Sequence, residues 1–299
     1  YTKLNILHNL NADKLPDDQL TLGFSMQTLL IGIGAVIGSW LPYMLGNWFG
    51  MATESESAGL VPANVSWSFY IGAFVLLGSI IWTVIRTDEY PPEFYGDAEA
   101  EDKKTKFKIP KTMWQLLLVQ FFSWFALFSM WVFTTPAVAQ NFFGTTDPNS
   151  SAYQEAGNWV GILFGVYNGV SALIALSLPI LAKRIGRKAT HSTALVIGGI
   201  SFLSFAIMPN ATWLLLPMIG IGIAWGSILA MPYAMLANSI PAKKMGMFMG
   251  LFNMSITIPQ IVNGVTGGLI LKYLLNDNPL NSLLMAGVLM IIAAGFTFM

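Results

Sequence analysis

Long apolar runs separated by short polar segments dominate the pattern of hydrophobic and polar positions along the chain. A membrane-spanning helix needs about 20 mostly apolar residues. The runs do not alternate between apolar and polar positions, as the strands of a membrane barrel do. The pattern therefore predicts an all-α integral membrane protein with eight transmembrane helices, at about 21–45, 65–85, 113–139, 158–181, 190–208, 211–236, 245–274 and 280–299.

The composition supports this prediction. Of 299 residues, 55% are hydrophobic and 10% are charged, whereas soluble domains carry about 25% charged residues. The chain has no cysteine and 2 histidines, which leaves little for a metal site, and we expect no cofactor. Because 15 basic residues balance 15 acidic ones, nothing points to nucleic acid, and the expected large partner is the lipid bilayer.

The basic residues gather on one side of the predicted helices. When successive connections are assigned to alternating sides, every lysine and arginine except Lys272 falls on the same side. By the positive-inside rule, that side is cytoplasmic. We therefore expect both termini in the cytoplasm and a location in the plasma membrane, such as a bacterial inner membrane.

A charged segment with three prolines divides the chain at 86–112, and such a composition is typical of a linker. Ala-Asp-Lys-Leu-Pro at 12–16 resembles Ala-Asn-Ser-Ile-Pro at 237–241, six spans later. Two parallel six-helix halves are the architecture of major facilitator transporters. We interpret 1–85 as the last two spans of an N-terminal half and 113–299 as the C-terminal half. The eight spans then hold positions five to twelve of twelve, and we expect four more spans before Tyr1.

Four stretches resemble known transporters. Residues 120–128 (QFFSWFALF) resemble position seven of sucrose and related disaccharide transporters, in the glycoside-pentoside-hexuronide branch of the major facilitator superfamily. Residues 250–260 are similar to position eleven, 183–188 to the basic loop between positions eight and nine, and 22–27 to the start of position five. The likeness covers about 12–299. It implies alternating access for a disaccharide of the sucrose or maltose class, with symport of a proton or sodium ion.

Polar and aromatic side chains share one face of the third predicted span. At about 100° per residue, this face is about 100° wide and holds Gln120, Trp124, Trp131, Thr134 and Thr135. A buried amide without a partner costs roughly 1–3 kcal/mol, so the face should line protein or water. A substrate cavity is one interpretation. Hydrogen bonding between helices, with the tryptophans as packing, is the other.

Further polar groups lie in the fourth, sixth and seventh predicted spans. Each is as typical of helix packing as of substrate contact, but together they fit a mostly apolar site with a few polar groups. The predicted substrate-binding residues are therefore the five above together with Tyr167, Asn168, Trp225, Tyr233, Asn253, Thr257 and Gln260.

No aspartate or glutamate falls within a predicted span. Since the resembled family places its cation-coupling carboxylate in the front half, we expect that acid upstream of Tyr1. His191, at the inner end of the fifth span, is expected to be interfacial. The basic loop lies near helix ends, where cations favour exposed carbonyls. It either gates the inner side or only sets topology, and its residues are Lys183, Arg184, Gly186, Arg187 and Lys188.

Glycines at four-residue spacing let membrane helices approach closely. Static packing and sliding between transporter halves are equally compatible with them. They occur in the first, fourth and seventh predicted spans, as Gly34 and Gly38, as Gly161, Gly165 and Gly169, and as Gly264 and Gly268.

The predicted function is secondary transport of a disaccharide or related glycoside. A sugar uniporter, a non-transporting membrane receptor and an inactive remnant are the alternatives. A scaffold would not need the polar face of the third span. An enzyme is not expected, because the spans contain no ionisable pair, metal cluster or nucleophile with its base.

Overall fold

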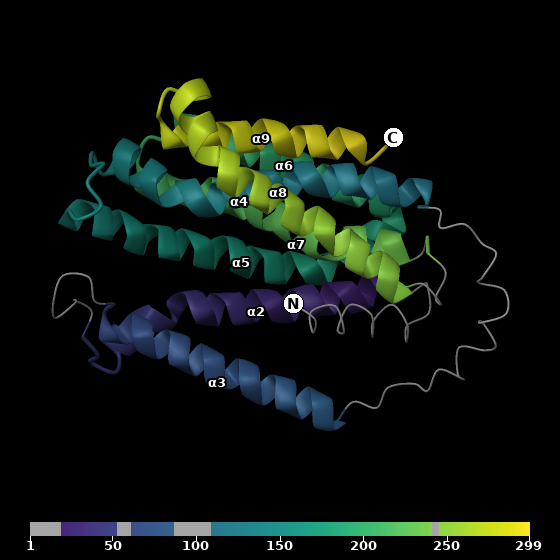
Figure 1. The fold of residues 1–299 in the computed structure, drawn as a ribbon, viewed down its shortest axis with the longest axis horizontal. Helices are drawn as coiled ribbons and strands as arrows, with labels where there is room; N and C mark the ends of the chain where they lie inside the picture. The colour runs from purple at the N-terminus through teal and green to yellow at the C-terminus, as the bar shows by residue number, and fades with distance from the viewer. Residues whose placement is uncertain (1–18, 53–60, 87–108, 238, 241–244) are drawn as a thin grey trace. The chain divides into compact units, whose positions relative to one another are not determined.

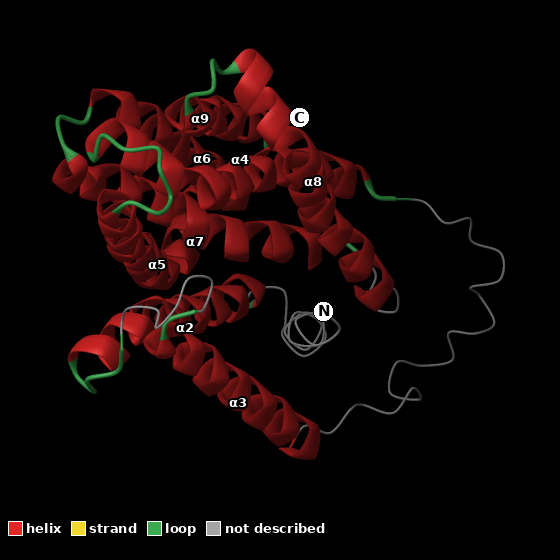
Figure 2. Cartoon of the chain, turned by 60° about the vertical axis from the view of Figure 1, so that its left-hand side comes forward, coloured by secondary structure: helices red, strands yellow, loops and turns green. Residues whose placement is uncertain are grey.

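The computed structural model describes residues 19–52, 61–86, 109–237, 239–240 and 245–299. These residues form helices joined by short loops, with no strand among them (Figure 2). In chain order the elements are α2 (Leu20–Asn47), α3 (Ala63–Arg86), α4 (Lys111–Phe142), α5 (Ser151–Ile185), α6 (Arg187–Ser204), the 3-10 turns η2 (Phe205–Ile207) and η3 (Ala211–Leu214), α7 (Leu215–Ala237), α8 (Met245–Leu274) and α9 (Pro279–Phe296).

Eight helices of the described chain are long and apolar enough to cross a membrane, which confirms the predicted fold class. The connection between the third and fourth predicted spans, at about 139–158, is shorter than predicted, because α4 continues to Phe142 and α5 begins at Ser151. The side chain of Ser150 accepts a hydrogen bond from the backbone N–H of Tyr153. This N-cap starts α5 among polar residues, before its apolar run.

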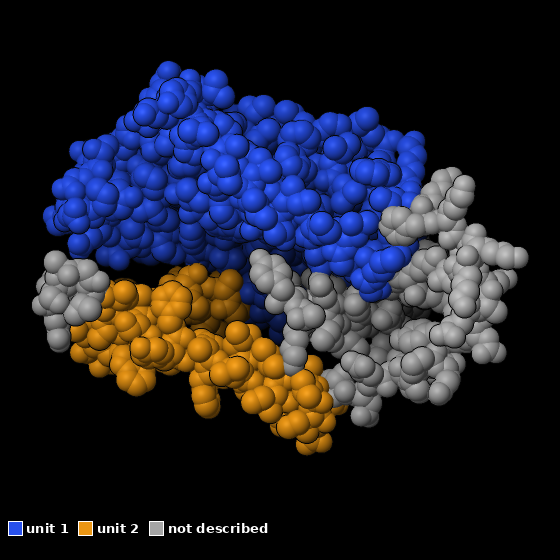
Figure 3. Space-filling model, viewed as in Figure 1, with its two compact units in different colours: residues 1–33, 108–299 blue, residues 34–107 orange. Residues whose placement is uncertain are grey.

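The chain divides into two compact units (Figure 3). The larger unit comprises 1–33 and 108–299, and the smaller comprises 34–107. In the smaller unit, Asn64 is the buried residue of α3, and its amide donates a hydrogen bond to the carbonyl of Pro42 at 3.0 Å. The remainder of α3 is largely exposed. The assignment of 1–85 and 113–299 to two transporter halves stays a prediction.

In the larger unit, α4, α6, α7 and α9 lie side by side, and α5 and α8 pack on α7 and α4 (Figure 1). Gly199 on α6 and Gly287 on α9 permit a close approach of these two helices. A Cβ added to either would lie within 2.8 Å of the other's carbonyl oxygen. Small residues at a contact let two membrane helices pack backbone to backbone.

Five of the seven glycines predicted for close approach do not occupy such contacts. A Cβ on Gly34, Gly38, Gly161 or Gly268 would meet no atom within 4 Å, and one on Gly264 would meet only Phe128 at 3.9 Å. A glycine face becomes a contact only where a partner helix covers it. Close contacts are made instead by other glycines, among them Gly199 on α6, Gly222 on α7 and Gly287 on α9.

Hydrogen bonds identify the two ends of the larger unit. At one end, Lys188 donates to the Gln115 side chain at 3.4 Å, so the starts of α4 and α6 lie together. At the other, the Trp159 indole donates to the Ala211 carbonyl at 2.9 Å, next to the start of α7. We call the first the basic end, after its cations Lys111, Lys183, Arg184, Arg187 and Lys188.

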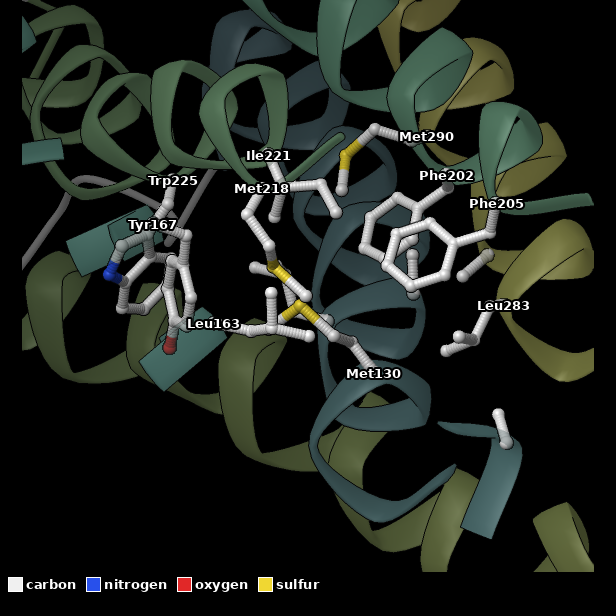
Figure 4. Packing of buried hydrophobic residues seen from close by; sticks show 14 of the residues in the cluster. Met130, Leu163, Tyr167, Phe202, Phe205, Met218, Ile221, Trp225, Leu283 and Met290 are labelled. Carbon is white, nitrogen blue, oxygen red and sulfur yellow. The ribbon is translucent and has the colours of Figure 1, made fainter. Parts of the chain in front are cut away.

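The core of the larger unit has two hydrophobic clusters. One lies where α4, α5, α6, α7 and α9 meet, and Figure 4 shows Met130, Leu163, Phe202 and Ile221 within it. The second contains Phe24 from α2, Met235 from α7 and Phe252 from α8. Helix α7 contributes to both clusters and is buried over most of its length. It is therefore the central helix of this unit.

Candidate functional site

Three tryptophans from two helices meet inside the larger unit. Trp124 and Trp131 lie on α4 and Trp225 lies on α7. Their ring centroids are 5.5 to 6.1 Å apart, and each pair meets edge to face. Tyr167 and Asn168 of α5 border the rings, and Figure 4 shows Tyr167 beside Trp225. We call these five residues the tryptophan cluster. Edge-to-face contacts fix the orientation of aromatic rings.

Two of the three indoles are anchored by hydrogen bonds. The Trp131 indole N–H donates to the Tyr167 hydroxyl at 3.1 Å, and the Trp225 indole N–H donates to Asn168 Oδ1 at 3.2 Å. Both bonds reach α5 from another helix. The sequence did not predict these pairings, although all four residues were on its candidate list. The aromatic rings of the tryptophan cluster are thus held in fixed positions and are largely buried.

The third indole and a neighbouring amide have no partner among the described residues. The Trp124 indole nitrogen and both polar atoms of the Gln120 side chain are buried and make no hydrogen bond. Gln120 is 0% exposed and lies one helical turn from Trp124. Leaving such groups unpaired costs about 1–3 kcal/mol each. Two donor nitrogens and one acceptor oxygen are therefore available together at the tryptophan cluster, for water or for a polar ligand.

The other polar residues of this α4 face are less available. Thr134 is fully buried, but its hydroxyl donates to the Met130 carbonyl in its own helix at 2.6 Å. Thr135 is half-buried, and its methyl group faces Gly157 of α5. Of the five residues predicted to share the face, Gln120 and Trp124 thus offer free polar groups.

A second group of candidates lies nearer the basic end. The Tyr233 hydroxyl donates to Asn253 Oδ1 at 2.9 Å, which joins α7 to α8. Phe24 of α2 stacks on Tyr233 at 5.8 Å, and Phe252 meets it edge to face at 5.4 Å. We call these four residues the tyrosine cluster. The sequence did not predict the part taken by the two phenylalanines.

Two further candidates on α8 are half-buried. The Thr257 hydroxyl donates to the Asn253 carbonyl of its own helix at 3.3 Å, which leaves its lone pairs available. Gln260 lies nearly one turn further along. The predicted substrate-binding residues therefore divide between the tryptophan cluster, the tyrosine cluster and this stretch of α8.

Sequence reasoning missed Asn263, which is 2% exposed. Its amide nitrogen donates to the Phe125 carbonyl at 3.1 Å and to the Ser129 hydroxyl at 2.6 Å. Both hydrogens of the amide thus bind α8 to α4. An asparagine within a predicted span was a signal that could have found this contact, because such side chains commonly bond across membrane helices.

The sequence suggested that His191 is interfacial, but the structure places it in the interior. It is 0% exposed, and its Nδ1 lies 2.9 Å from the Ser227 hydroxyl of α7. The expectation was wrong because it used only the position of His191 near the end of an apolar run. The side chain lies on the face of α6 that packs against α7, where Ser227 supplies a polar partner.

The predicted gating residues surround the junction of α5 and α6. Gly186 joins the helices with a φ of 85°, in a region that residues with a Cβ rarely adopt. Arg187 donates to the Thr21 hydroxyl of α2 at 2.8 Å and to the Ala234 carbonyl of α7 at 3.1 Å. Lys183 and Arg184 are exposed. One guanidinium thus bridges three helices at the basic end.

The described residues contain no group of three or more histidine, aspartate or glutamate side chains that could hold a metal ion. Their carboxylates are Asp147, Glu155 and Asp277, in connections or in the first turns of α5. The chemistry of the described interior is therefore that of neutral hydrogen-bonding groups and aromatic rings.

Comparison with known proteins supports a transporter fold. The sucrose transport protein SUC4 of Arabidopsis thaliana is 22% identical over 280 residues. The match covers 81% of this chain and 54% of that protein, so the chain spans about half the length of this curated relative.

Two crystal structures of a bacterial homologue of the iron transporter ferroportin, in the outward-facing state, share the fold. One superposes with a TM-score of 0.52 at 17% identity, covering 94% of this chain and 65% of the other. The second, with soaked iron, superposes with a TM-score of 0.55 at 16% identity, and the match covers 98% of this chain and 68% of the other. The family model for the Major Facilitator Superfamily matches residues 5–264. With its apolar helices and this match over most of its length, the chain belongs to the Major Facilitator Superfamily.

Proposed function

We propose that this chain is part of a transporter that moves a disaccharide or related glycoside across a membrane by alternating access, with proton or sodium symport. The observation that carries the proposal is the tryptophan cluster with the unpaired groups of Gln120 and Trp124 beside it. The similarity to a sucrose transport protein supports the choice of substrate class. A transporter is favoured over an enzyme, since the superfamily and the solved structures with this fold point to transport.

A sugar suits this site because it has two kinds of surface. Its C–H faces pack on aromatic rings, and its hydroxyls both donate and accept hydrogen bonds. In the proposed complex, the rings of the tryptophan cluster contact a C–H face. One hydroxyl donates to Gln120 Oε1, and others accept from the Gln120 amide and the Trp124 indole N–H. The groups left unpaired in the protein thereby gain partners.

The tyrosine cluster, Thr257 and Gln260 extend the proposed binding surface toward the basic end. In the tyrosine cluster, Asn253 accepts the hydrogen bond of the Tyr233 hydroxyl through Oδ1. The second sugar unit of a disaccharide supplies hydroxyls for these groups. We propose that the first sugar ring binds at the tryptophan cluster and that the second contacts α8.

The basic end is proposed to be the inner gate. The positive-inside distribution favours a cytoplasmic position for this end, with both termini inside and a plasma membrane, such as a bacterial inner membrane, as the location. Arg187 bridges α2, α6 and α7 there. An inward opening that separates α2 from α7 must break one of these bonds. Gly186, Lys183, Arg184 and Lys188 lie at the junction of α5 and α6 that would move with it.

Uptake into proteoliposomes tests the proposal. The complete protein is reconstituted, and accumulation of labelled sucrose and maltose is measured with a proton gradient, with a sodium gradient and with neither. We expect accumulation above equilibrium with one gradient only. Equilibration without accumulation would indicate a uniporter and remove cation coupling. Absence of uptake for both sugars, from protein that remains monodisperse in detergent, would contradict the proposed substrate class.

A further inference from the structure

The start of α2 packs against the rest of the larger unit along one face. Its buried residues recur at intervals of three and four, which places them on one side of a helix. They are Leu20, Thr21, Phe24, Ser25, Thr28 and Gly32. Two of them contact the basic end through side chains, since Thr21 accepts from Arg187 at 2.8 Å and the Phe24 ring stacks on Tyr233. Gly32 is the last buried residue of this face within the larger unit.

At Gly32 the backbones of α2 and α5 meet with no more than a methyl group between them. A Cβ added to Gly32 would lie 2.7 Å from the Cβ of Ala172 and 3.0 Å from the carbonyl oxygen of Asn168. Carbon atoms in contact are about 3.5–4.0 Å apart, so glycine is what permits this approach. Asn168 belongs to the tryptophan cluster, where its side chain accepts from Trp225. The contact therefore lies at the depth of the proposed sugar site.

Helix α5 is seated on α7 at the same depth. A Cβ on Gly222 would lie 2.6 Å from the Tyr167 carbonyl oxygen, and one on Gly226 would lie 3.0 Å from the Ser171 carbonyl oxygen. Such packing of backbone on backbone leaves α5 little room to shift against α7. In a motion that separates α2 from this pair, α5 and α7 therefore move together.

A tilt of α2 about Gly32 would affect the two ends of the buried face differently. Thr21 precedes Gly32 by 11 residues, which is about 16 Å along a helix. A tilt of about 10° would move Thr21 by about 3 Å, enough to break its hydrogen bond to Arg187. The contact at Gly32 would change little, because it lies on the axis of the tilt and has no side chain to rearrange.

We propose that Gly32 is the pivot on which α2 rocks against α5 when the basic end opens and closes. The inference rests on the proposed alternating access, in which α2 and α5 belong to different halves of the transporter. A pivot beside the tryptophan cluster lets the basic end open while α2 and α5 stay in contact next to the sugar. Gly32 is thus a positioning residue, which touches no substrate.

Two cysteine pairs test the pivot in the complete protein, since this chain contains no cysteine of its own. Gly32→Cys/Ala172→Cys forms a disulfide at the pivot. Leu22→Cys/Ala182→Cys lies at the basic end, where both residues line one cavity of about 400 Å³, and is joined by a short reducible bis-methanethiosulfonate linker. Uptake of labelled sugar is compared with that of the same variant after reduction, so that the cost of the substitutions cancels.

We expect the pivot disulfide to leave at least about half of the uptake of its reduced form. The link at the basic end should lower uptake at least about tenfold, with recovery on reduction, because it prevents opening. Loss of uptake with the pivot disulfide would overturn the proposal, since α2 and α5 would then have to separate at Gly32. Full uptake with the basic end linked would overturn it as well, since α2 would not rock.

The rate of cross-linking needs no sugar and so separates this inference from the proposed substrate. Each pair is cross-linked in the parent and in Arg187→Gln, which removes one hold on α2. We expect the pivot pair to react at rates within about twofold and the basic-end pair to slow at least about fivefold in Arg187→Gln. These rates without sugar uptake would contradict the substrate and support the pivot. Equal slowing of both pairs would overturn the pivot, whatever the uptake.

Gly32→Ala tests the glycine itself. We expect uptake to fall about fivefold, because the added methyl group forces α2 and α5 apart, while the affinity for sugar stays within about twofold. Gly34→Ala is the matched control, since a Cβ there would meet no atom within 4 Å. Adding Ala172→Gly to Gly32→Ala removes the opposing methyl group and should restore at least about half of the lost uptake. Equal uptake by the Gly32→Ala and Gly34→Ala variants would overturn the role of Gly32.

Discussion

At the scale of single residues, Gln120 carries the strongest sign of function in the described interior. Both polar atoms of its side chain are buried without a partner, and proteins retain few such groups because each costs about 1–3 kcal/mol. If the amide served only packing, leucine would serve better. Stability and function therefore make opposite demands on this position.

We expect Gln120→Leu to raise the melting temperature of the purified protein while lowering sugar uptake at least tenfold. The gain arises because the unpaired amide is removed, and the loss arises because the sugar hydroxyl loses its partner. Differential scanning fluorimetry and proteoliposome uptake measure the two effects. Gln154→Leu, at an exposed position of α5, is the control and should change neither. A destabilised Gln120→Leu protein with normal uptake would show that the amide has a structural role.

Trp124 permits a second residue-scale prediction. Trp124→Phe keeps an aromatic ring against Trp131 and Trp225 but removes the unpaired indole N–H. We expect uptake to fall about tenfold, because a hydrogen bond to the substrate is lost, with a melting temperature within a few degrees of the parent. Trp114→Phe is the matched control, since Trp114 is 56% exposed on the same helix. Equal uptake by the two variants would exclude the Trp124 N–H from binding.

Gly186 shows how one residue defines the junction between two helices. With φ at 85° and ψ at 155°, its backbone occupies a region that is essentially restricted to glycine. We expect Gly186→Ala to destabilise the protein by about 1–3 kcal/mol, seen as a lower melting temperature. Gly161→Ala is the control, because its Cβ would meet no atom within 4 Å inside α5, and alanine favours a helix over glycine. Similar melting of both variants would mean that the junction adapts.

At the scale of elements, the membrane made the helices predictable. Backbone groups in hydrocarbon must bond within their own segment, so each apolar run had to be a helix, and all eight were found near their predicted places. The predicted start of α5 was several residues too late because it too was based on apolarity alone. Apolarity marks where a helix is in lipid, whereas the Ser150 cap decides where it begins.

Contacts between elements were less predictable, because each depends on two faces at once. The polar face of α4 was visible from helical periodicity, but the partners of Trp131 and Trp225 on α5 were not. The spaced glycines on α5 and α8 indicated close packing, yet a tight contact joins Gly199 on α6 and Gly287 on α9. The prediction for His191 was wrong for a similar reason. It used the position of the residue along its apolar run, whereas the helix that packs against the side chain was not predicted.

Asn263 supports an element-scale prediction about how α8 is held. Its amide bonds α4 at two points, while much of α8 is exposed. A double-mutant cycle of Asn263→Ala and Ser129→Ala should give a coupling of about 0.6–1.7 kcal/mol in detergent unfolding, the range of such bonds in membrane proteins. Thr266→Val is the control, because that hydroxyl bonds only its own helix. Strict additivity in the cycle would show that the pair contributes no link.

At the scale of the whole molecule, alternating access requires that closure at one end be coupled to opening at the other. Arg187 holds the basic end together by binding α2 and α7 from α6. Removing its side chain should favour the inward-open state. Because this chain contains no cysteine, single reporter cysteines can be placed in it. Ser25, 2% exposed and one turn from Thr21 on α2, reports the basic end. Ala156, 0% exposed on α5, reports the opposite end.

We expect Arg187→Gln to increase the rate of labelling of Ser25→Cys by a membrane-impermeant maleimide at least fivefold and to decrease that of Ala156→Cys. The opposite signs matter, since local unfolding at the basic end would raise the first rate and leave the second unchanged. Arg184→Gln, the adjacent exposed cation, should alter neither rate. If both reporters react faster in Arg187→Gln, the residue stabilises the fold. If neither changes, its bonds to α2 and α7 do not set the equilibrium between the two states, and the gate must depend on other contacts.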